Sequence, residues 1–177
     1  MNAIIDPAID ALLALAAERP WRHISLRGIA QTAEVPFAEL YDQVPSKLAL
    51  LARLSRRLDA AALATVATES EDAHDRLFDA TMARIEAMTP LREALISISR
   101  DAGTIAIANH FPLTARAILE AAGVEATPPR LAAMTLVWVR VAQVWRDDEG
   151  ALNRTMAELD KRLKQMRERL SQIGAGF

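Results

Sequence analysis

The chain has 177 residues, of which 51% are hydrophobic and 25% charged, a balance that favours an ordered globular protein. Its formal net charge of −2 gives no overall positive field, so contact with nucleic acid or an anionic membrane must come from local patches. The absence of cysteine excludes disulfides, iron–sulfur clusters and thiol catalysis. The N-terminus carries Asp6 and Asp10 without a basic leader, and no uncharged apolar run reaches the roughly 18 residues of a membrane span, so we expect a cytoplasmic protein.

Residues 1–47 are expected to form a head of three helices. Apolar residues recur at helical spacing over about residues 7–18, which predicts the first helix. Ser25 is a suitable N-cap for a second helix at residues 26–32, and the pattern predicts a third at residues 37–42. A tight connection through Glu34-Val35-Pro36 separates the last two helices. This outline is typical of a helix-turn-helix.

Residues 48–177 are expected to form a helical body. Ser46 is a suitable N-cap for a long connecting helix that reaches about Thr68, with an apolar ridge at Leu48, Leu51, Leu54 and Leu58. The apolar pattern predicts five further helices: Ser70 to Met88, Thr89-Pro90 to about Ile105, residues 113–122, Thr127 to Trp145, and Leu152 to Ile173. Asn109 to Pro112 interrupts this series, and Gly123 is a natural left-handed C-cap.

The helix expected from Thr127 to Trp145 is apolar almost all round. Leu136, Val139 and Val144 extend its broad apolar face, so we expect it to be buried on several sides. A strand is the rival interpretation of this β-branched run, but no partner strand is expected elsewhere in the chain. The sequence therefore predicts an all-α fold.

The last helix carries a heptad pattern over about three heptads. Its apolar residues step by four and three along the chain: Leu152, Met156, Leu159, Leu163, Met166, Leu170 and Ile173. We expect the first six to form the seam of a homodimer, built by the last two helices. Packing on the body of the same chain is the main alternative, and a helix on a membrane surface is a weaker one, suggested by the excess of Arg and Lys.

Between Trp21 and Lys47, residue types and spacing follow the pattern of a known family. The matching positions are Trp21, Ser25-Leu26-Arg27, Ile29-Ala30, Ala33, Val35, Leu40-Tyr41 and Pro45-Ser46-Lys47. In these positions the chain resembles the TetR family of transcriptional regulators. The resemblance covers roughly the first third of the chain and implies a helix-turn-helix head on a helical ligand-binding and dimerisation body.

The resemblance also implies which residues contact operator DNA. In such folds the third helix enters the major groove, and Arg27, Tyr41 and Lys47 take positions where the family approaches the phosphates. The expected DNA-binding set is Arg27, Phe37, Glu39, Tyr41, Gln43 and Lys47.

The chain departs from the family pattern on the surface that would meet DNA. Glu34 stands in place of the turn glycine, at a cost of roughly 1 kcal/mol if its backbone is left-handed. Glu39 and Asp42 add acidic groups, and residues 1–50 hold four positively and six negatively charged side chains. Attraction to phosphate supplies most non-specific DNA affinity, so we expect this acidic head to have a lower non-specific affinity for DNA than a basic one. Glu39 can instead accept a hydrogen bond from a cytosine amino group.

Two functions remain open at this point. The first is a ligand-responsive regulator, expected to be a repressor, in which an apolar small molecule in the body tilts the connecting helix and changes the separation of two heads. The second is a TetR-like fold that no longer reads DNA and binds a lipid or another apolar molecule, as the resemblance implies for some ubiquinone-biosynthesis accessory proteins. Both use the same expected pocket: Phe78, Met82, Met88, His110, Phe111, Met134, Trp138 and Trp145, unless these are simply core residues.

Enzymatic and metal chemistry have little support in the sequence. His23, His74 and His110 lack the spacing that places two ligands on one helical face, so no metal site is expected. No phosphate-cradling glycine loop and no nucleophile beside a base is found, so we expect neither an enzyme nor a cofactor.

Overall fold

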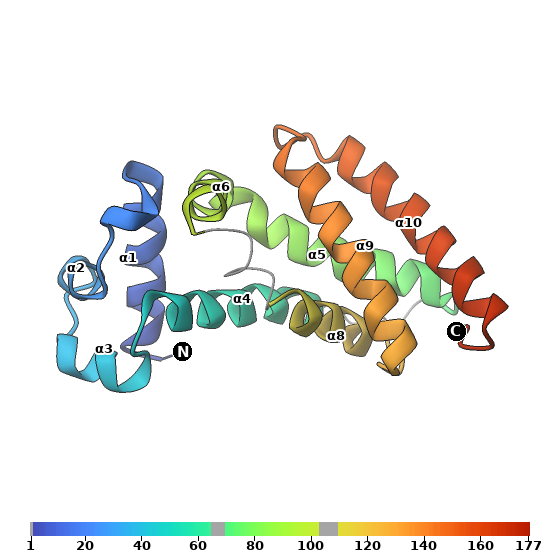
Figure 1. Ribbon diagram of the computed structural model, residues 1–177, viewed down its shortest axis with the longest axis horizontal. Coiled ribbons are helices and arrows are strands. Elements are labelled where there is room, and N and C mark those ends of the chain that lie inside the picture. The colour runs from blue at the N-terminus through green and yellow to red at the C-terminus, as the bar shows by residue number, and fades with distance from the viewer. Residues whose placement is uncertain (1, 65–69, 103–109) are drawn as a thin grey trace. The chain divides into compact units, whose positions relative to one another are not determined.

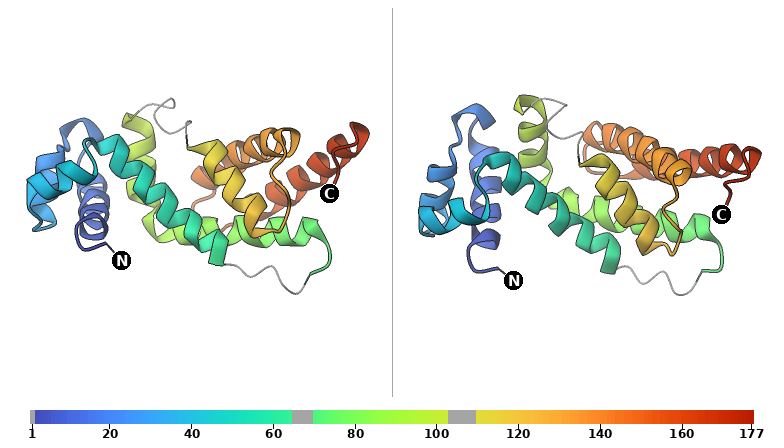
Figure 2. Two further views of the ribbon diagram at one scale, coloured as in Figure 1. Left: turned by 90° about the horizontal axis from the view of Figure 1, so that it is seen from below. Right: turned by 60° about the horizontal axis from the view of Figure 1, so that its bottom comes forward.

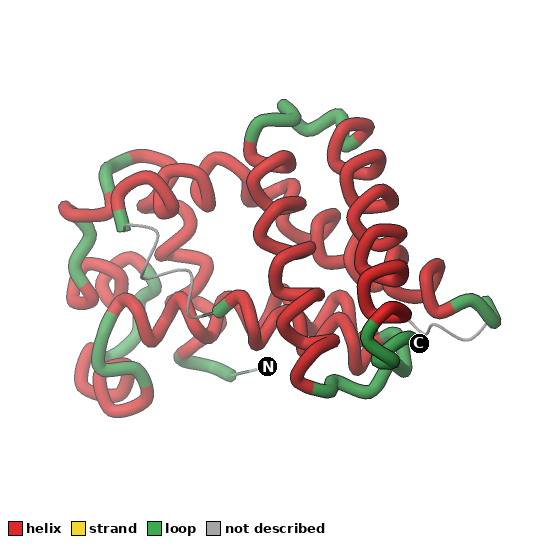
Figure 3. Tube along the Cα trace, turned by 45° about the vertical axis from the view of Figure 1, so that its right-hand side comes forward, coloured by secondary structure: helices red, strands yellow, loops and turns green. Residues whose placement is uncertain are grey.

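The structure, a computed structural model, describes residues 2–64, 70–102 and 110–177. Over these residues it consists of α-helices, two short 3-10 helices and loops, with no strand, which confirms the all-α prediction (Figures 1 and 3). The elements are α1 (Ile5–Glu18), η1 (Trp21–His23), α2 (Leu26–Thr32), α3 (Phe37–Gln43), α4 (Lys47–Ala64), α5 (Ala73–Met88), η2 (Thr89–Leu91), α6 (Arg92–Asp101), α8 (Phe111–Ala121), α9 (Pro128–Arg146) and α10 (Asn153–Gln172).

The chain divides into two compact units. The first comprises residues 1–57 and 91–108, and the second comprises residues 58–90 and 109–177. This division differs from the expected one at residue 47, because it falls within α4 and groups α6 with the head. The physical reason lies inside the first unit, where α6 packs on α1 and the Asp101 carboxylate accepts the backbone N–H of Trp21 at 3.0 Å.

The core of the head comes from the apolar stripes of α1, α2 and α3, which lie against one another (Figure 1). Ile9, Leu12, Ile29 and Leu40 are fully buried there. Each such side chain contributes about 1.5–3 kcal/mol relative to an exposed position. The Ser25 hydroxyl accepts the N–H of Gly28 at 3.0 Å, so the predicted N-cap of the second helix is confirmed.

The first helix begins at Ile5, two residues earlier than expected. The side-chain oxygen of Asn2 accepts the N–H groups of Ile4 and Ile5, both at 2.9 Å. These bonds satisfy donors that a helix start leaves without intrahelical partners. A proline is tolerated in the first turn, so Pro7 does not have to mark the beginning.

The turn between α2 and α3 has the strained backbone that its sequence suggests. Glu34 has φ of 54°, and the N–H groups of Glu34 and Val35 bond to the carbonyls of Gln31 and Ala30. This is the hydrogen-bond pattern of a Schellman C-cap, in which glycine usually takes the left-handed position. The glutamate keeps the turn at a cost of roughly 1–2 kcal/mol.

The connecting helix begins as predicted, since the Ser46 hydroxyl accepts the N–H of Ala49 at 3.1 Å. Leu50, Leu51, Leu54 and Leu58 are buried along α4, whereas Leu48, expected in this ridge, is 47% exposed. The expected helix end near Thr68 lies outside the described residues.

The start of α5 is set by Asp72 and not by Ser70. The Asp72 carboxylate accepts the N–H of His74 at 2.9 Å, while the Ser70 hydroxyl bonds to the N–H of Asp72 in the preceding turn. The next helix is expected to start at Thr89-Pro90, but the Thr89 hydroxyl does not cap it and donates back to the Ile85 carbonyl. A 3-10 turn follows, and α6 begins only at Arg92. The expected continuation through Gly103 to Ile105 lies outside the described residues.

The short helix α8 begins at Phe111, with Pro112 in its first turn, two residues before its expected start. Gly123 follows it with φ of 65°, and the N–H groups of Gly123 and Val124 bond to the carbonyls of Glu120 and Leu119. This Schellman motif confirms the predicted glycine C-cap. Of the expected break, Asn109 lies outside the described residues.

The helices α9 and α10 lie side by side in the second unit (Figure 2). Four heptad residues of α10, namely Leu159, Leu163, Met166 and Leu170, are buried within the single chain, where α10 packs on α9 and α5. They therefore take the alternative role, packing on the body, instead of forming a free dimer seam. The same burial removes the apolar face that a membrane-surface helix needs. Met156 is 42% exposed, and Leu152 precedes the helix with φ of 60°.

Burial of α9 is less complete than expected. Met134, Val137, Trp138, Val141 and Trp145 are buried, but Leu136 is 68% exposed. In the described part of the chain, no helix is long and apolar enough to cross a membrane.

Candidate nucleic-acid interface

Helix α3 presents an acidic outer surface. Leu40 is buried, and successive residues turn by about 100° in a helix, so the opposite side carries Ala38, Glu39 and Asp42. All three are exposed, and no Lys or Arg occurs between Phe37 and Gln43. The segment that a helix-turn-helix places in the major groove thus offers carboxylates and a methyl group to its surroundings.

Three residues of the expected DNA-binding set form one cluster. The guanidinium carbon of Arg27 lies 4.6 Å from the centre of the Phe37 ring, in a cation–π contact. The Phe37 and Tyr41 rings are 5.9 Å apart at 55°, one helical turn from each other. Tyr41 is 53% exposed. The structure therefore brings Arg27, Phe37 and Tyr41 together at the junction of α2 and α3.

Lys47 is held inside the first unit. Its ammonium donates to the Trp21 carbonyl at 2.7 Å and lies 4.3 Å from the centre of the Trp21 ring. Partial burial lowers the pKa of Lys47 from its ordinary value. The backbone N–H of Trp21 in turn donates to the Asp101 carboxylate. The cation expected to approach a phosphate is thus bound by a protein carbonyl and an aromatic ring.

Gln43 and Glu39 differ in their surroundings. The Gln43 side-chain oxygen accepts from the Asn2 amide at 3.0 Å, so the residue that caps α1 also holds the end of α3. The Glu39 side chain forms no hydrogen bond or ion pair within the described part of the chain. Of the expected set, Arg27, Glu39, Tyr41 and Gln43 are exposed, and Phe37 and Lys47 are half-buried.

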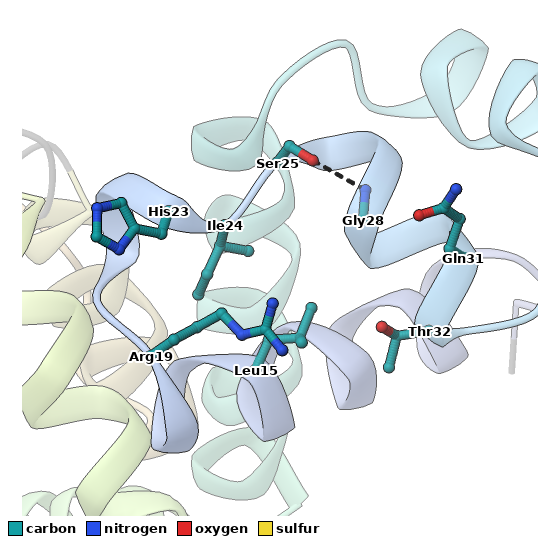
Figure 4. A pocket seen from close by; sticks show the side chains of 8 residues that line it. All are labelled: Leu15, Arg19, His23, Ile24, Ser25, Gly28, Gln31 and Thr32. Atoms are coloured by element: carbon teal, nitrogen blue, oxygen red, sulfur yellow. Dashed lines mark hydrogen bonds between the residues drawn. The ribbon is translucent and has the colours of Figure 1, made fainter.

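A polar hollow on the head was missed by the sequence reasoning. It has a volume of about 180 Å³ and lies between α1, η1 and α2 (Figure 4). Its lining residues are Leu15, Arg19, His23, Ile24, Ser25, Gly28, Gln31 and Thr32. The sequence signal for it is the group of arginines and a histidine just before Ser25; the charge count included the arginines but assigned them to no site.

The expected ligand-pocket residues lie in the second unit, and most belong to its core. Met82, Met88, Met134, Trp138 and Trp145 are buried, whereas Phe78, His110 and Phe111 are half-buried. The indole N–H groups of Trp138 and Trp145 are buried without a hydrogen-bond acceptor in the described part of the chain. Buried indole N–H groups usually find a partner, so this pair is unusual.

A charged pair, not predicted from the sequence, lies among these apolar residues. The buried Arg84 donates from Nε to the Asp59 carboxylate at 2.6 Å, and the Thr114 hydroxyl donates to the same oxygen at 3.0 Å. The Arg84 guanidinium lies 4.5 Å from the centre of the Trp138 ring and contacts the Met88 sulfur. Burial lowers the pKa of Arg84, and the charge of Asp59 opposes this shift.

Comparison with known structures identifies the fold. A TetR transcriptional regulator from Rhodococcus sp. RHA1 matches with a TM-score of 0.68 and 16% identity, over 93% of this chain and 95% of that chain. The dihydroxyacetone kinase operon activator DhaS matches with a TM-score of 0.60 and 11% identity, over 97% and 96%. A further transcriptional regulator from Rhodococcus sp. Rha1 matches with a TM-score of 0.58 and 20% identity, over 93% and 96%.

No protein-family model and no curated protein matches the chain. The structural similarity, which extends over nearly the whole chain, shows that it has the fold of TetR transcriptional regulators. The predicted resemblance is thereby confirmed for the fold.

Proposed function

We propose that this chain with a TetR-like fold is a transcriptional regulator that contacts operator DNA through α3. The observation that carries the proposal is the α2–turn–α3 unit, in which Leu40 and Ile29 hold the two helices together while the outer side of α3 is free of protein contacts that bury it. A recognition helix in the major groove needs such an exposed side. A role on DNA is consistent with the expected cytoplasmic location, and the proposal requires no cofactor.

We further propose that a small molecule in the second unit controls DNA binding and that the protein acts as a repressor. The buried Trp138 and Trp145 indoles support an effector that is mainly apolar and carries a hydrogen-bond acceptor. The helix α4 extends from Lys47 beside Trp21 to Asp59 beside Arg84, so it contacts both groups of residues. Such a ligand can shift α4, and with it the head, only if it binds the DNA-binding conformation and the non-binding conformation with different affinity.

A homodimer through α9 and α10 is part of this proposal; of the expected seam it keeps Met156, because Leu159, Leu163, Met166 and Leu170 are buried within the chain. The exposed Leu136 and Met156 supply apolar area outside the buried heptad residues. On the same two helices, Glu158 accepts hydrogen bonds from Arg140 at 3.1 Å and Arg162 at 2.7 Å. An exposed leucine among paired charges fits an interface with an apolar centre and a polar rim.

A specific observation favours a second candidate function, a TetR-like protein that has lost DNA binding and holds a lipid or another apolar molecule. The outer side of α3 carries two carboxylates, and both Arg27 and Lys47 have partners within the head. The carboxylates of such a head are repelled by the phosphates of DNA, which lowers its affinity.

DNA binding measured against salt separates the two functions. Labelled duplex from the region upstream of the protein's own gene is titrated by fluorescence anisotropy between about 50 and 200 mM salt, beside a scrambled duplex. A regulator prefers the native duplex, and its affinity falls steeply as salt rises. Ala38→Trp places a bulky ring on the outer side of α3 and is expected to abolish this preference.

Ala60→Trp is the matched control, because Ala60 is an exposed alanine of α4 outside the head. It is expected to leave DNA binding unchanged. No preference for the native duplex at 50 mM salt, together with lipid that co-purifies and is detected by mass spectrometry, would reject the regulator and favour the second candidate.

A further inference from the structure

We propose that Trp138 and Trp145 mark the effector site of the second unit, and that this site takes an elongated, uncharged, mainly apolar molecule with two oxygen acceptors, such as a diester or a diketone. The word effector rests on the proposed function, whereas binding of such a molecule does not depend on DNA.

The two tryptophans carry buried hydrogen-bond donors that have no acceptor in the described part of the chain. Trp138 is 2% exposed and Trp145 is 4% exposed, and the Nε1 atom of each is buried without a partner. A buried donor without an acceptor destabilises the folded chain, because its hydrogen bonds with water are lost and not replaced. Phenylalanine would fill apolar space without this penalty, so packing alone does not account for the indoles. A ligand that brings an acceptor to each of them does.

The two donors lie on one side of α9. Trp138 and Trp145 are seven residues apart, close to two full turns, so their side chains leave the same side of the helix about 10 Å apart along its axis. Met134 and Val141 lie on that side as well and are buried. A single molecule that accepts from both indoles must therefore be elongated, run beside α9 and be apolar between its two acceptors.

Trp138 is held in position before any ligand arrives. The Arg84 guanidinium lies 4.5 Å from the centre of its ring, and Arg84 Nε donates to the Asp59 carboxylate at 2.6 Å. Thr114 donates to the same carboxylate oxygen, so residues of α4, α5 and α8 together support one face of the indole. A donor that is already fixed loses little conformational freedom when it binds an acceptor.

The buried charges favour an uncharged ligand. Among the described residues of the second unit, the buried charged side chains are Asp59, Arg84 and Asp148. Asp59 and Arg84 neutralise each other, and Asp148 accepts two hydrogen bonds from Thr155 at the start of α10. An ionised ligand would enter without a counter-charge, and burial of an unpaired charge is strongly unfavourable. An uncharged carbonyl oxygen accepts from an indole, which is a donor only, without this penalty.

Methionines give the second unit room to adapt to such a ligand. Met82, Met88 and Met134 are buried there, and the Met88 sulfur contacts Arg84. A methionine side chain has three rotatable bonds and adapts to irregular space. Because the indole nitrogens are enclosed in the free protein, we expect the ligand to reach them when these side chains rotate.

The indole N–H signals report on the site directly. Protein labelled with ¹⁵N in its three tryptophans is titrated with dimethyl sebacate, an uncharged diester whose two carbonyl groups are separated by a long alkyl chain. The indole protons of Trp138 and Trp145 are expected to shift downfield, because each gains an acceptor, and to titrate with the same Kd, because one molecule contacts both. The signal of Trp21, in the first unit, is expected to stay unchanged.

Three results of this titration would overturn the proposal. The first is the absence of a saturable shift at either Trp138 or Trp145. The second is a different Kd for the two signals, which would mean that no single molecule contacts both indoles. The third comes from the sebacate dianion, which has the same chain with two charges and is expected not to bind. Binding of the dianion as tight as that of the diester would show that the site accepts charge.

Trp138→Phe and Trp145→Phe each remove one donor and keep an aromatic ring. Each is expected to weaken diester binding severalfold, measured from the shift of the indole that remains. Trp21→Phe is the matched control, because Trp21 is 7% exposed and its bonds with Asp101 and Lys47 use its backbone N–H and carbonyl. It is expected to leave diester binding unchanged. An equal loss of binding in all three variants would show a general loss of stability and would overturn the role of the two indoles.

The DNA titration separates failure of this site from failure of the proposed function. A protein that prefers the native duplex but shows no indole shift keeps the proposed function and loses the site. A protein whose indoles shift but that binds no duplex keeps the site, rejects the regulator and favours the second candidate function. Where both bind, the diester is expected to change the affinity for the duplex severalfold, and an unchanged affinity would show that the ligand is not an effector.

Discussion

The ammonium of Lys47 donates to the carbonyl oxygen of Trp21 at 2.7 Å and lies over the ring of the same residue. Lys47 is therefore a structural cation of the head in the free protein. Lys47→Met is expected to lower the free energy of unfolding by about 1–3 kcal/mol, because a charged hydrogen bond and a cation–π contact are lost. Urea denaturation followed by circular dichroism measures this change.

The same variant tests whether Lys47 also binds phosphate. If the contact with Trp21 persists on DNA, Lys47→Met leaves the salt slope of DNA binding unchanged, as does Arg56→Gln, which removes an exposed cation of the same helix. A slope that falls by about 1 for Lys47→Met alone would show that Lys47 leaves Trp21 and contacts the backbone.

The buried pair of Asp59 and Arg84 gives a second prediction, for the other unit. Arg84→Met leaves the Asp59 carboxylate buried with only the Thr114 hydroxyl as a described partner, and Asp59→Leu leaves the guanidinium without its carboxylate. Each single substitution is expected to cost about 3–5 kcal/mol, because an uncompensated charge stays buried. The double variant should be more stable than the sum of the two predicts, since it removes both charges.

A double-mutant cycle from urea denaturation checks this coupling. Thr114→Val is the control, because it deletes one hydrogen bond to Asp59 and keeps both charges, and its cost is expected to be about 1 kcal/mol. Strictly additive effects of Asp59→Leu and Arg84→Met would mean that the two side chains do not depend on each other.

Local signals in the sequence account for much of the fold. Ser25, Ser46 and Gly123 cap helices as predicted, because capping depends on residue type and on neighbours within four positions. The inward-facing pattern around Ile29 and Leu40 likewise specifies a helix-turn-helix core, since burial follows the helical period. These features involve few residues and short separations.

Contacts between distant residues were not predictable in the same way. Asp59 contacts Arg84, and Asp101 contacts Trp21, only after the helices have packed. No local sequence pattern predicts which distant residues will pair in this way. The heptad of α10 shows the same limit, because periodicity identifies an apolar face without identifying what covers it. Charge counting similarly found the head acidic but did not separate the carboxylates of α3 from the hollow near Arg19.

Asp148 gives a prediction of pH dependence. Its buried carboxylate accepts the N–H of Thr155 at 2.9 Å and the hydroxyl at 2.7 Å, and so caps the start of α10. Burial acts to raise the pKa of Asp148, but the hydrogen bonds from Thr155, together with the charge and the backbone N–H of Arg154, hold this pKa below its ordinary value. A depressed pKa stabilises the folded state above the pKa of the unfolded chain, about 3.9, and this contribution disappears as the pH falls further.

Asp148→Asn keeps an acceptor oxygen and removes the charge, so it isolates this effect. The melting temperature of the variant is expected to lie below that of the parent protein at pH 7 and to approach it as the pH falls below the ordinary aspartate pKa, about 3.9, and Asp148 becomes protonated. Asp147→Asn is the control, because Asp147 is exposed at the neighbouring position. A difference in melting temperature that stays constant from pH 7 to pH 3 would show that the charge of Asp148 does not contribute.

The two faces of the α9–α10 pair give opposite predictions for assembly. Leu163 is buried within the chain, so Leu163→Ala is expected to lower the free energy of unfolding by about 2–5 kcal/mol without changing the number of chains per particle. Leu136 is 68% exposed on α9, so Leu136→Asp is expected to convert the proposed dimer into monomers with little loss of monomer stability.

Leu113→Asp is the matched control, because Leu113 is an exposed leucine of α8, 53% accessible. Light scattering after size exclusion measures the molar mass at micromolar concentration. A monomeric parent protein would reject the dimer and with it the two-headed mechanism, and equal behaviour of Leu136→Asp and Leu113→Asp would place the interface elsewhere.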